Sequence, residues 1–62
     1  MDWKEIGIKI KAEREKKNLT QAQLAEKIGV SNVFISQLES GAKRASADNL
    51  AKLSKTLNIK FF

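Results

Sequence analysis

The sequence predicts a small all-α fold of four helices joined by short connections. Apolar residues recur every three or four positions, whereas the alternation typical of strands is not sustained anywhere. Proline is absent, and Gly29 and Gly41 each follow an apolar helical pattern, as glycines that end helices do. Because the chain has only 62 residues, we expect residues 1–62 to form a single domain.

The first predicted helix runs from about Asp2 to Lys17. Its inward side is predicted to carry Trp3, Ile6, Ile10 and the pair Glu13 and Arg14. Gly7 lies inside this helix, where glycine is about 1 kcal/mol less favourable than alanine. The helix is therefore predicted to form despite one unfavourable residue.

Each of the three later helices is expected to begin just after a hydroxyl residue that caps it. Thr20 precedes a helix over residues 21–28. Ser31 precedes a helix from Asn32 to about Ser40, and Ser46 precedes one over residues 47–57. The residues expected to face inward in these helices are Leu24, Ala25, Ile28, Ile35, Leu38, Leu50, Leu53 and Leu57.

The composition argues against an enzyme. There is no histidine or cysteine, which excludes imidazole and thiol catalysis, the usual zinc sites and disulfides. A catalytic cleft of ~300–1,000 Å³ would also remove much of so small a core. A minimal hydrolase using carboxylates is the enzymatic alternative, and only a loss of activity on mutating Glu13 or Glu15 would revive it. We expect no enzymatic activity, no cofactor and no metal.

The charge balance favours a polyanionic partner. Twelve Lys and Arg residues against seven Asp and Glu give a net charge of +5, which on so small a body favours nucleic acid. A surface that merely confers solubility is the alternative. The longest uncharged run, residues 28–38, is too short to span a bilayer. We therefore expect a cytoplasmic chain with no membrane partner.

The second and third helices have the spacing of a helix-turn-helix over about residues 20–40. Their caps leave a tight turn of Gly29 and Val30 between them. Gly29 can adopt a positive φ where a side chain would clash, and Ala25 is small enough to let the two helices approach each other. The pair is therefore predicted to cross steeply.

The residues of this motif are Leu19-Thr20-Gln21-x-x-Leu24-Ala25-x-x-x-Gly29-Val30-Ser31-x-x-x-Ile35-Ser36-x-x-Glu39-x-Gly41. The pattern closely resembles the phage Cro/CI and Xre-type helix-turn-helix repressors, and the flanking helices extend the resemblance over nearly the whole chain. It implies a lambda-repressor-like domain that binds double-stranded DNA sequence-specifically as a transcriptional regulator, with repression as the expected action. The family usually continues into a fifth helix used in dimerisation, and we expect residues 58–62 to hold at most its first residues.

The third helix is expected to read DNA with an uncharged outer face. With Ile35 and Leu38 inward, ~100° per residue places the opposite side at Asn32, Val33, Ser36, Gln37 and Ser40. Asn and Gln can pair with adenine, and Val can contact a thymine methyl group. Because no Arg or Lys is there to bind guanine, we expect a preference for A·T-containing steps. Ordinary solvated helix surface is the alternative.

Contacts to the DNA backbone are expected around that face. We assign them to Gln21, Ser31, Ser40, Lys43 and Arg44. Gln21 begins a helix, where backbone amides favour an anion, and the resemblance implies that it binds a phosphate. The resemblance also implies that the loop with Lys43 and Arg44 contacts the sugar–phosphate backbone. The family often has proline where this chain has Ala45, so a looser loop is expected.

The resemblance further implies a partly buried salt bridge between Arg14 and Glu39 behind the third helix. From the residues alone, only compatible helix faces follow. Two independent surface charges are therefore the alternative.

The expected partner is double-stranded DNA, bound by a homodimer on a two-fold operator with half-sites ~34 Å apart. No small-molecule effector is expected. Phe61 and Phe62 either contribute to the dimer or fold back onto Trp3 and Leu57. A protein–protein interaction module on the same scaffold, such as an antitoxin or coactivator segment, is the functional alternative. The sequence is consistent with a complete small regulator and with one domain of a longer repressor.

Overall fold

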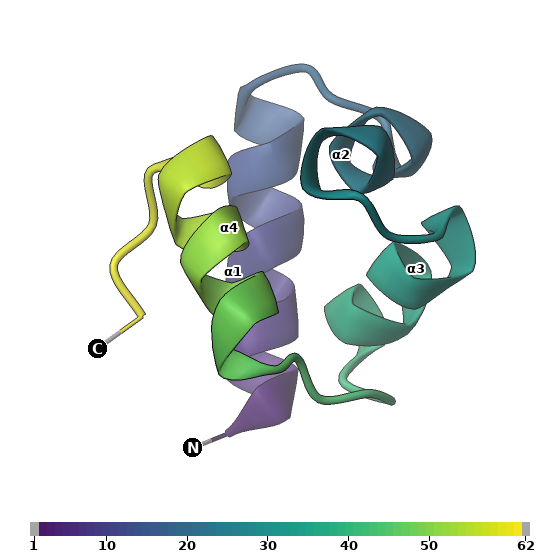
Figure 1. Ribbon diagram of the computed structural model, residues 1–62. Coiled ribbons are helices and arrows are strands. Elements are labelled where there is room, and N and C mark those ends of the chain that lie inside the picture. The colour runs from purple at the N-terminus through teal and green to yellow at the C-terminus, as the bar shows by residue number, and fades with distance from the viewer. Residues whose placement is uncertain (1, 62) are drawn as a thin grey trace.

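The computed structural model describes residues 2–61, which form four α-helices and no strand (Figure 1). The helices are α1 (Trp3–Lys16), α2 (Gln21–Ile28), α3 (Asn32–Ser40) and α4 (Ala47–Leu57). The predicted all-α fold is confirmed, and only α1 differs from its predicted bounds, by one residue at each end. Within residues 2–61, no helix has the length and apolar character that a membrane span requires.

Side-chain caps fix where the helices begin. Asp2, Thr20, Ser31 and Ser46 each accept a hydrogen bond from a backbone N–H in the first turn of the helix that follows. At α2 the cap is reciprocal, because the Gln23 side chain also accepts from the Thr20 N–H at 2.8 Å. These bonds satisfy amides that the first turn of a helix leaves unpaired. Local chemistry therefore explains why the predicted starts agree with the observed ones.

Three of the helices end at a residue in the left-handed backbone conformation. Gly29 follows α2 with φ 75°, Gly41 follows α3 with φ 81°, and Asn58 follows α4 with φ 56°. Glycine adopts this conformation without steric cost, and asparagine tolerates it better than most residues. Each of these residues lets the chain turn sharply enough to begin the next segment.

The core lies where the helices meet. Helix α1 packs against α3 and α4, and α2 packs against the same two helices (Figure 1). The buried apolar residues are Ile10, Leu24, Ala25, Ile28, Ile35, Leu38, Ala45, Leu50, Leu53, Leu57 and Ile59. Trp3, Ile6, Leu19, Val30, Phe34 and Phe61 are partly buried against them. Every apolar residue predicted to face inward therefore contacts this core.

The described part of the C-terminal tail returns to the core. Ile59 is buried, and its N–H donates to the Ser54 carbonyl oxygen at 3.0 Å, while the Ser54 hydroxyl donates to the Ile59 carbonyl oxygen. Phe61 is partly buried against the core, and residues 58–61 are not helical. Phe62 lies outside the described residues, so dimerisation through the two phenylalanines stays a prediction.

Gly7 lies where α1 crosses α3. A Cβ atom at this position would be only 2.6 Å from the Glu39 carbonyl oxygen, and the Leu38 carbonyl oxygen is closer still. The missing side chain lets the two backbones approach each other directly. The glycine that is unfavourable for an isolated helix is therefore required by the packing of two helices.

We predict that Gly7→Ala destabilises the domain by about 1–3 kcal/mol, because the new methyl group overpacks the crossing. At an ordinary helical position the same change would stabilise by ~1 kcal/mol. Urea unfolding followed by circular dichroism measures the difference. Ala12→Gly, at an exposed position of the same helix, is the matched control and should cost ~1 kcal/mol. A stabilised Gly7→Ala variant would contradict the close crossing.

Candidate nucleic-acid interface

One side of α3 faces solvent and carries no charge. Ile35 and Leu38 point into the core with at most 1% of their surface exposed, whereas Val33 on the opposite side is 65% exposed. Asn32 and Ser36 are also exposed and Gln37 is half-buried. We call these four residues, Asn32, Val33, Ser36 and Gln37, the reading face. Among residues 2–61, the other largely exposed large apolar side chain is Ile8 on α1.

The shape of α3 suits a DNA groove. Its nine residues span ~14 Å, and a helix with its side chains is ~10–12 Å across. The major groove of B-DNA is about 12 Å wide. In Figure 1, α3 lies at the edge of the molecule, with α2 crossing beside it and α1 on its inner side. The outer side of α3 is therefore accessible to a duplex.

A tight turn follows the reading face and leads to two basic residues. The Gln37 carbonyl oxygen accepts from the Ala42 N–H at 2.9 Å and from the Lys43 N–H at 3.3 Å. Lys43 and Arg44 are exposed, and the next residue, Ala45, is buried in the core. Both ends of this loop are held, and the looser loop expected where Ala45 replaces proline stays a prediction. The two cations therefore project from a short segment beside α3.

The structure brings Arg14 and Glu39 together. The Arg14 Nε donates to Glu39 Oε2 at 2.6 Å and its Nη2 donates to Glu39 Oε1 at 3.2 Å. The remaining Nη1 donates to the Leu19 carbonyl oxygen at 2.6 Å. Both charged residues are 8% exposed. This bidentate pair connects α1, the segment before α2, and α3.

Gln21 joins the same network, which the sequence did not predict. Its Nε2 donates to Glu39 Oε1 at 2.9 Å, so the side chain at the start of α2 is tied to α3. A carboxamide nitrogen has two hydrogens, so a second donor is available to a phosphate. The residues are 18 positions apart, and their sequence spacing carries no sign of the contact. Arg14, Gln21 and Glu39 are called the buried network below.

The hydrogen bonds of the buried network compensate for its burial. The hydrogen bond to Glu39 raises the pKa of Arg14, while burial acts in the opposite direction. The net effect favours the charged guanidinium. Among residues 2–61, no buried side-chain nitrogen or oxygen lacks a hydrogen-bond partner. Such a pair orients the elements that it joins more than it adds to stability.

The two serines assigned to backbone contacts have different hydroxyl bonding. The Ser31 hydroxyl accepts from the Phe34 N–H at 3.0 Å, which leaves its hydrogen available to a phosphate. The Ser40 hydroxyl donates to the Gln37 carbonyl oxygen at 3.0 Å. Because a hydroxyl has one hydrogen, Ser40 would have to release that bond before it could donate to DNA.

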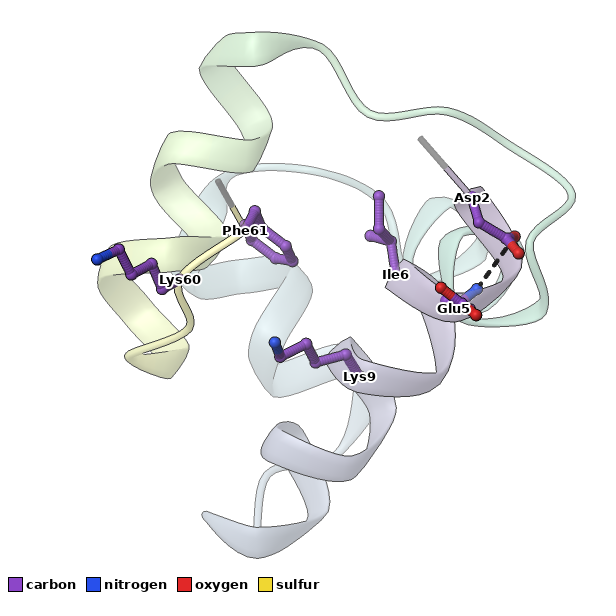
Figure 2. A pocket seen from close by; sticks show the side chains of 6 residues that line it. All are labelled: Asp2, Glu5, Ile6, Lys9, Lys60 and Phe61. Carbon is purple, nitrogen blue, oxygen red and sulfur yellow. Dashed lines mark hydrogen bonds between the residues drawn. The ribbon is translucent and has the colours of Figure 1, made fainter.

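A hollow of about 250 Å³ lies away from this face, between the start of α1 and the tail (Figure 2). Its lining residues are Asp2, Glu5, Ile6, Lys9, Lys60 and Phe61, none of which belongs to α2 or α3. The volume is below the ~300–1,000 Å³ of typical ligand pockets. Within the described residues, no group of three or more acidic side chains is placed to hold a metal ion.

The sequence profile of a helix-turn-helix family matches residues 10–62, which is most of the chain. The chain belongs to the helix-turn-helix family of Cro/CI and Xre-type regulators. The resemblance in the sequence is thereby confirmed, and α2 and α3 are the two helices of the motif.

Several relatives match this helix-turn-helix domain. An uncharacterized HTH-type transcriptional regulator of Mycobacterium tuberculosis is 42% identical over 53 residues, which cover 86% of this chain and 38% of that protein. Repressor protein C2 of Salmonella phage P22 is 42% identical over 57 residues, or 92% of this chain and 26% of the repressor. Control protein C.BamHI of Bacillus amyloliquefaciens is 34% identical over 55 residues, or 87% of this chain and 68% of that protein. The chain therefore spans less than half of the first two relatives.

We predict that removing one partner of the buried pair destabilises this helix-turn-helix domain more than removing both. Glu39→Leu leaves the Arg14 guanidinium buried without its carboxylate, at a cost of ~3–5 kcal/mol. Arg14→Met combined with Glu39→Leu removes both charges and should recover much of that loss. Urea unfolding measures all the variants.

The control is Glu15→Leu, because the Glu15 carboxylate is exposed and lies 3.9 Å from the same guanidinium. It should leave the unfolding midpoint nearly unchanged. If the double variant is no more stable than Glu39→Leu, the unpaired Arg14 guanidinium is not the cause of the loss, and the prediction is contradicted.

Proposed function

We propose that this chain is the DNA-binding domain of a transcriptional repressor that inserts α3 into the major groove. The observation that carries the proposal is the reading face: an exposed, uncharged side of a short helix whose opposite side is fixed in the core. The names of the relatives, which include a phage repressor and HTH-type transcriptional regulators, support the same function. The protein would act in the cytoplasm, by occupying its operator and excluding other proteins from that DNA.

The reading face supplies groups that distinguish A·T from G·C pairs. The carboxamides of Asn32 and Gln37 can each pair with the N6 and N7 atoms of adenine, and exposed Val33 can pack against a thymine methyl group. Ser36 is short enough to let the helix approach the base edges closely. No guanidinium or ammonium group is present on this face to bind the O6 and N7 atoms of guanine. We therefore propose A·T-containing steps at the centre of each half-site.

Donors around the reading face would hold the DNA backbone. Gln21 lies at the N-terminus of α2, where backbone amides and the helix dipole favour a phosphate. Lys43 and Arg44 lie beyond the other end of α3, and Ser31 and Ser40 lie at its two ends. Contacts of this kind set position and orientation, whereas contacts to base edges set sequence preference.

We also propose that two copies bind a two-fold operator. Domains that present one recognition helix usually bind as dimers, with half-sites one helical turn, or ~34 Å, apart. Sedimentation of the chain with a duplex carrying two such half-sites would give a 2:1 complex. A 1:1 complex at saturation would contradict the proposal.

Selection from random duplexes, followed by titration with salt, tests the proposed function. The logarithm of the binding constant should fall with the logarithm of salt concentration at ~0.9 per phosphate contacted. Weak binding with little salt dependence would instead indicate a protein-binding module.

Two single variants should then distinguish residues that contact base edges from residues that contact the DNA backbone. We predict that Gln37→Ala relaxes preference at one base step, with a loss of ~1–3 kcal/mol in discrimination there. Lys43→Ala should weaken binding to all duplexes alike. Affinities for the selected site and for singly substituted sites measure both effects. Identical behaviour of the two variants would contradict the division between the reading face and the backbone contacts.

A further inference from the structure

The stem of Lys4 lies directly on Gly41. A Cβ atom at Gly41 would be 2.8 Å from the Cγ and 3.0 Å from the Cα of Lys4. The distance to the Cγ is shorter than real Cβ contacts, and the distance to the Cα is tighter than most of them, so the missing side chain of Gly41 makes room for Lys4. Gly41 also ends α3 with φ 81°. The first turn of α1 therefore packs against the C-terminal end of α3, where the loop with Lys43 and Arg44 begins.

The charge of Lys4 is not neutralised by an ion pair among the described residues. The basic residues of the ion pairs found within 2–61 are Arg14, Lys16 and Lys52. Lys4 is exposed, and its nearest acidic neighbours in the chain, Asp2 and Glu5, line the hollow on the tail side of α1 (Figure 2). Its ammonium group therefore remains available to an anion.

We propose that Lys4, in the first turn of α1, contacts a DNA phosphate. It would add a third basic residue to Lys43 and Arg44 at the C-terminal end of α3. The inference rests on the proposed function and adds to it a residue from outside the helix-turn-helix motif. The Lys43 N–H is bonded to the Gln37 carbonyl oxygen, which keeps the start of this loop against the last turn of α3. A lysine has a flexible four-carbon stem and binds phosphate as a point charge. In the proposed complex, Lys4, Lys43 and Arg44 would bind neighbouring phosphates at the C-terminal end of α3.

The competing role for Lys4 is structural. A cation beside the C-terminus of a helix interacts favourably with the helix dipole. In that role Lys4 would stabilise α3 without touching DNA. The two roles differ in the salt dependence of binding, which responds to the number of phosphates neutralised.

Lys4→Met in the 62-residue chain is the main test, because methionine keeps an unbranched stem on Gly41 and removes the charge. Binding to the duplex selected by the unaltered chain is measured at several salt concentrations. We expect the slope of log K against log salt to fall by about 0.9, with selected and scrambled duplexes weakened alike. Lys4→Gln should give the same slope if Lys4→Met folds poorly, and Lys4→Arg should preserve it.

Lys55→Met is the matched control. Lys55 is exposed in the last turn of α4, which lies on the other side of α1 from α3 in Figure 1. This variant makes the same charge change and should leave the slope unchanged. Thermal unfolding of each variant reports the structural role separately.

A lowered unfolding temperature for Lys4→Met with an unchanged slope would assign Lys4 to the capping of α3 and overturn the inference. Equal slopes for Lys4→Met, Lys55→Met and the unaltered chain would overturn it as well. If the unaltered chain shows no salt-dependent binding to any duplex, the proposed function itself fails. These outcomes are distinguishable because the unaltered chain is measured in each series.

Discussion

The bidentate pair of Arg14 and Glu39 fixes the orientation on which the rest of the molecule depends. It joins α1 to α3, and through the Leu19 carbonyl oxygen and the Gln21 side chain it also reaches the start of α2. A rotation of α3 would take the Glu39 carboxylate away from these donors and leave buried charges unpaired, which is costly. With Glu39 directed inward, the opposite side of α3 is left to the uncharged reading face.

The two close helix contacts made by glycines act together with this pair. Gly7 allows the α1 backbone to lie against the last carbonyl groups of α3, and Gly41 allows the first turn of α1 to lie over the end of α3. Helix α1 therefore supports α3 from Glu39 to its C-terminus. A helix held along its inner side in this way can present short side chains at fixed positions, which direct readout of base edges requires.

The helix starts and the core could be predicted from the sequence alone. Helix starts followed from the capping residues Thr20, Ser31 and Ser46, and the core followed from apolar spacing, because both depend on residues only a few positions apart. The exposure of the opposite side of α3 followed in the same way, since Ile35 and Leu38 define its inner side, while a role for that side in contacting bases stays a prediction.

Contacts between distant segments could not be predicted from such spacing. The bond from Gln21 to Glu39 and the seat of Lys4 on Gly41 each depend on the three-dimensional arrangement of several helices. A glycine at position 7 is unfavourable for an isolated helix, and only the close approach of the α3 backbone explains why it is needed there. The burial of Ile59 likewise depends on the left-handed turn at Asn58, which directs the tail back to the core.

A nitrogen-15 NMR titration of the labelled chain with its selected duplex tests most directly whether α3 is the surface that meets DNA. The predicted result is that the largest shift changes occur in the backbone amides of residues 32–37, with further changes at Gln21 and Lys43. Shift changes confined to α4 and the tail, with the amides of α3 unaffected, would contradict the account.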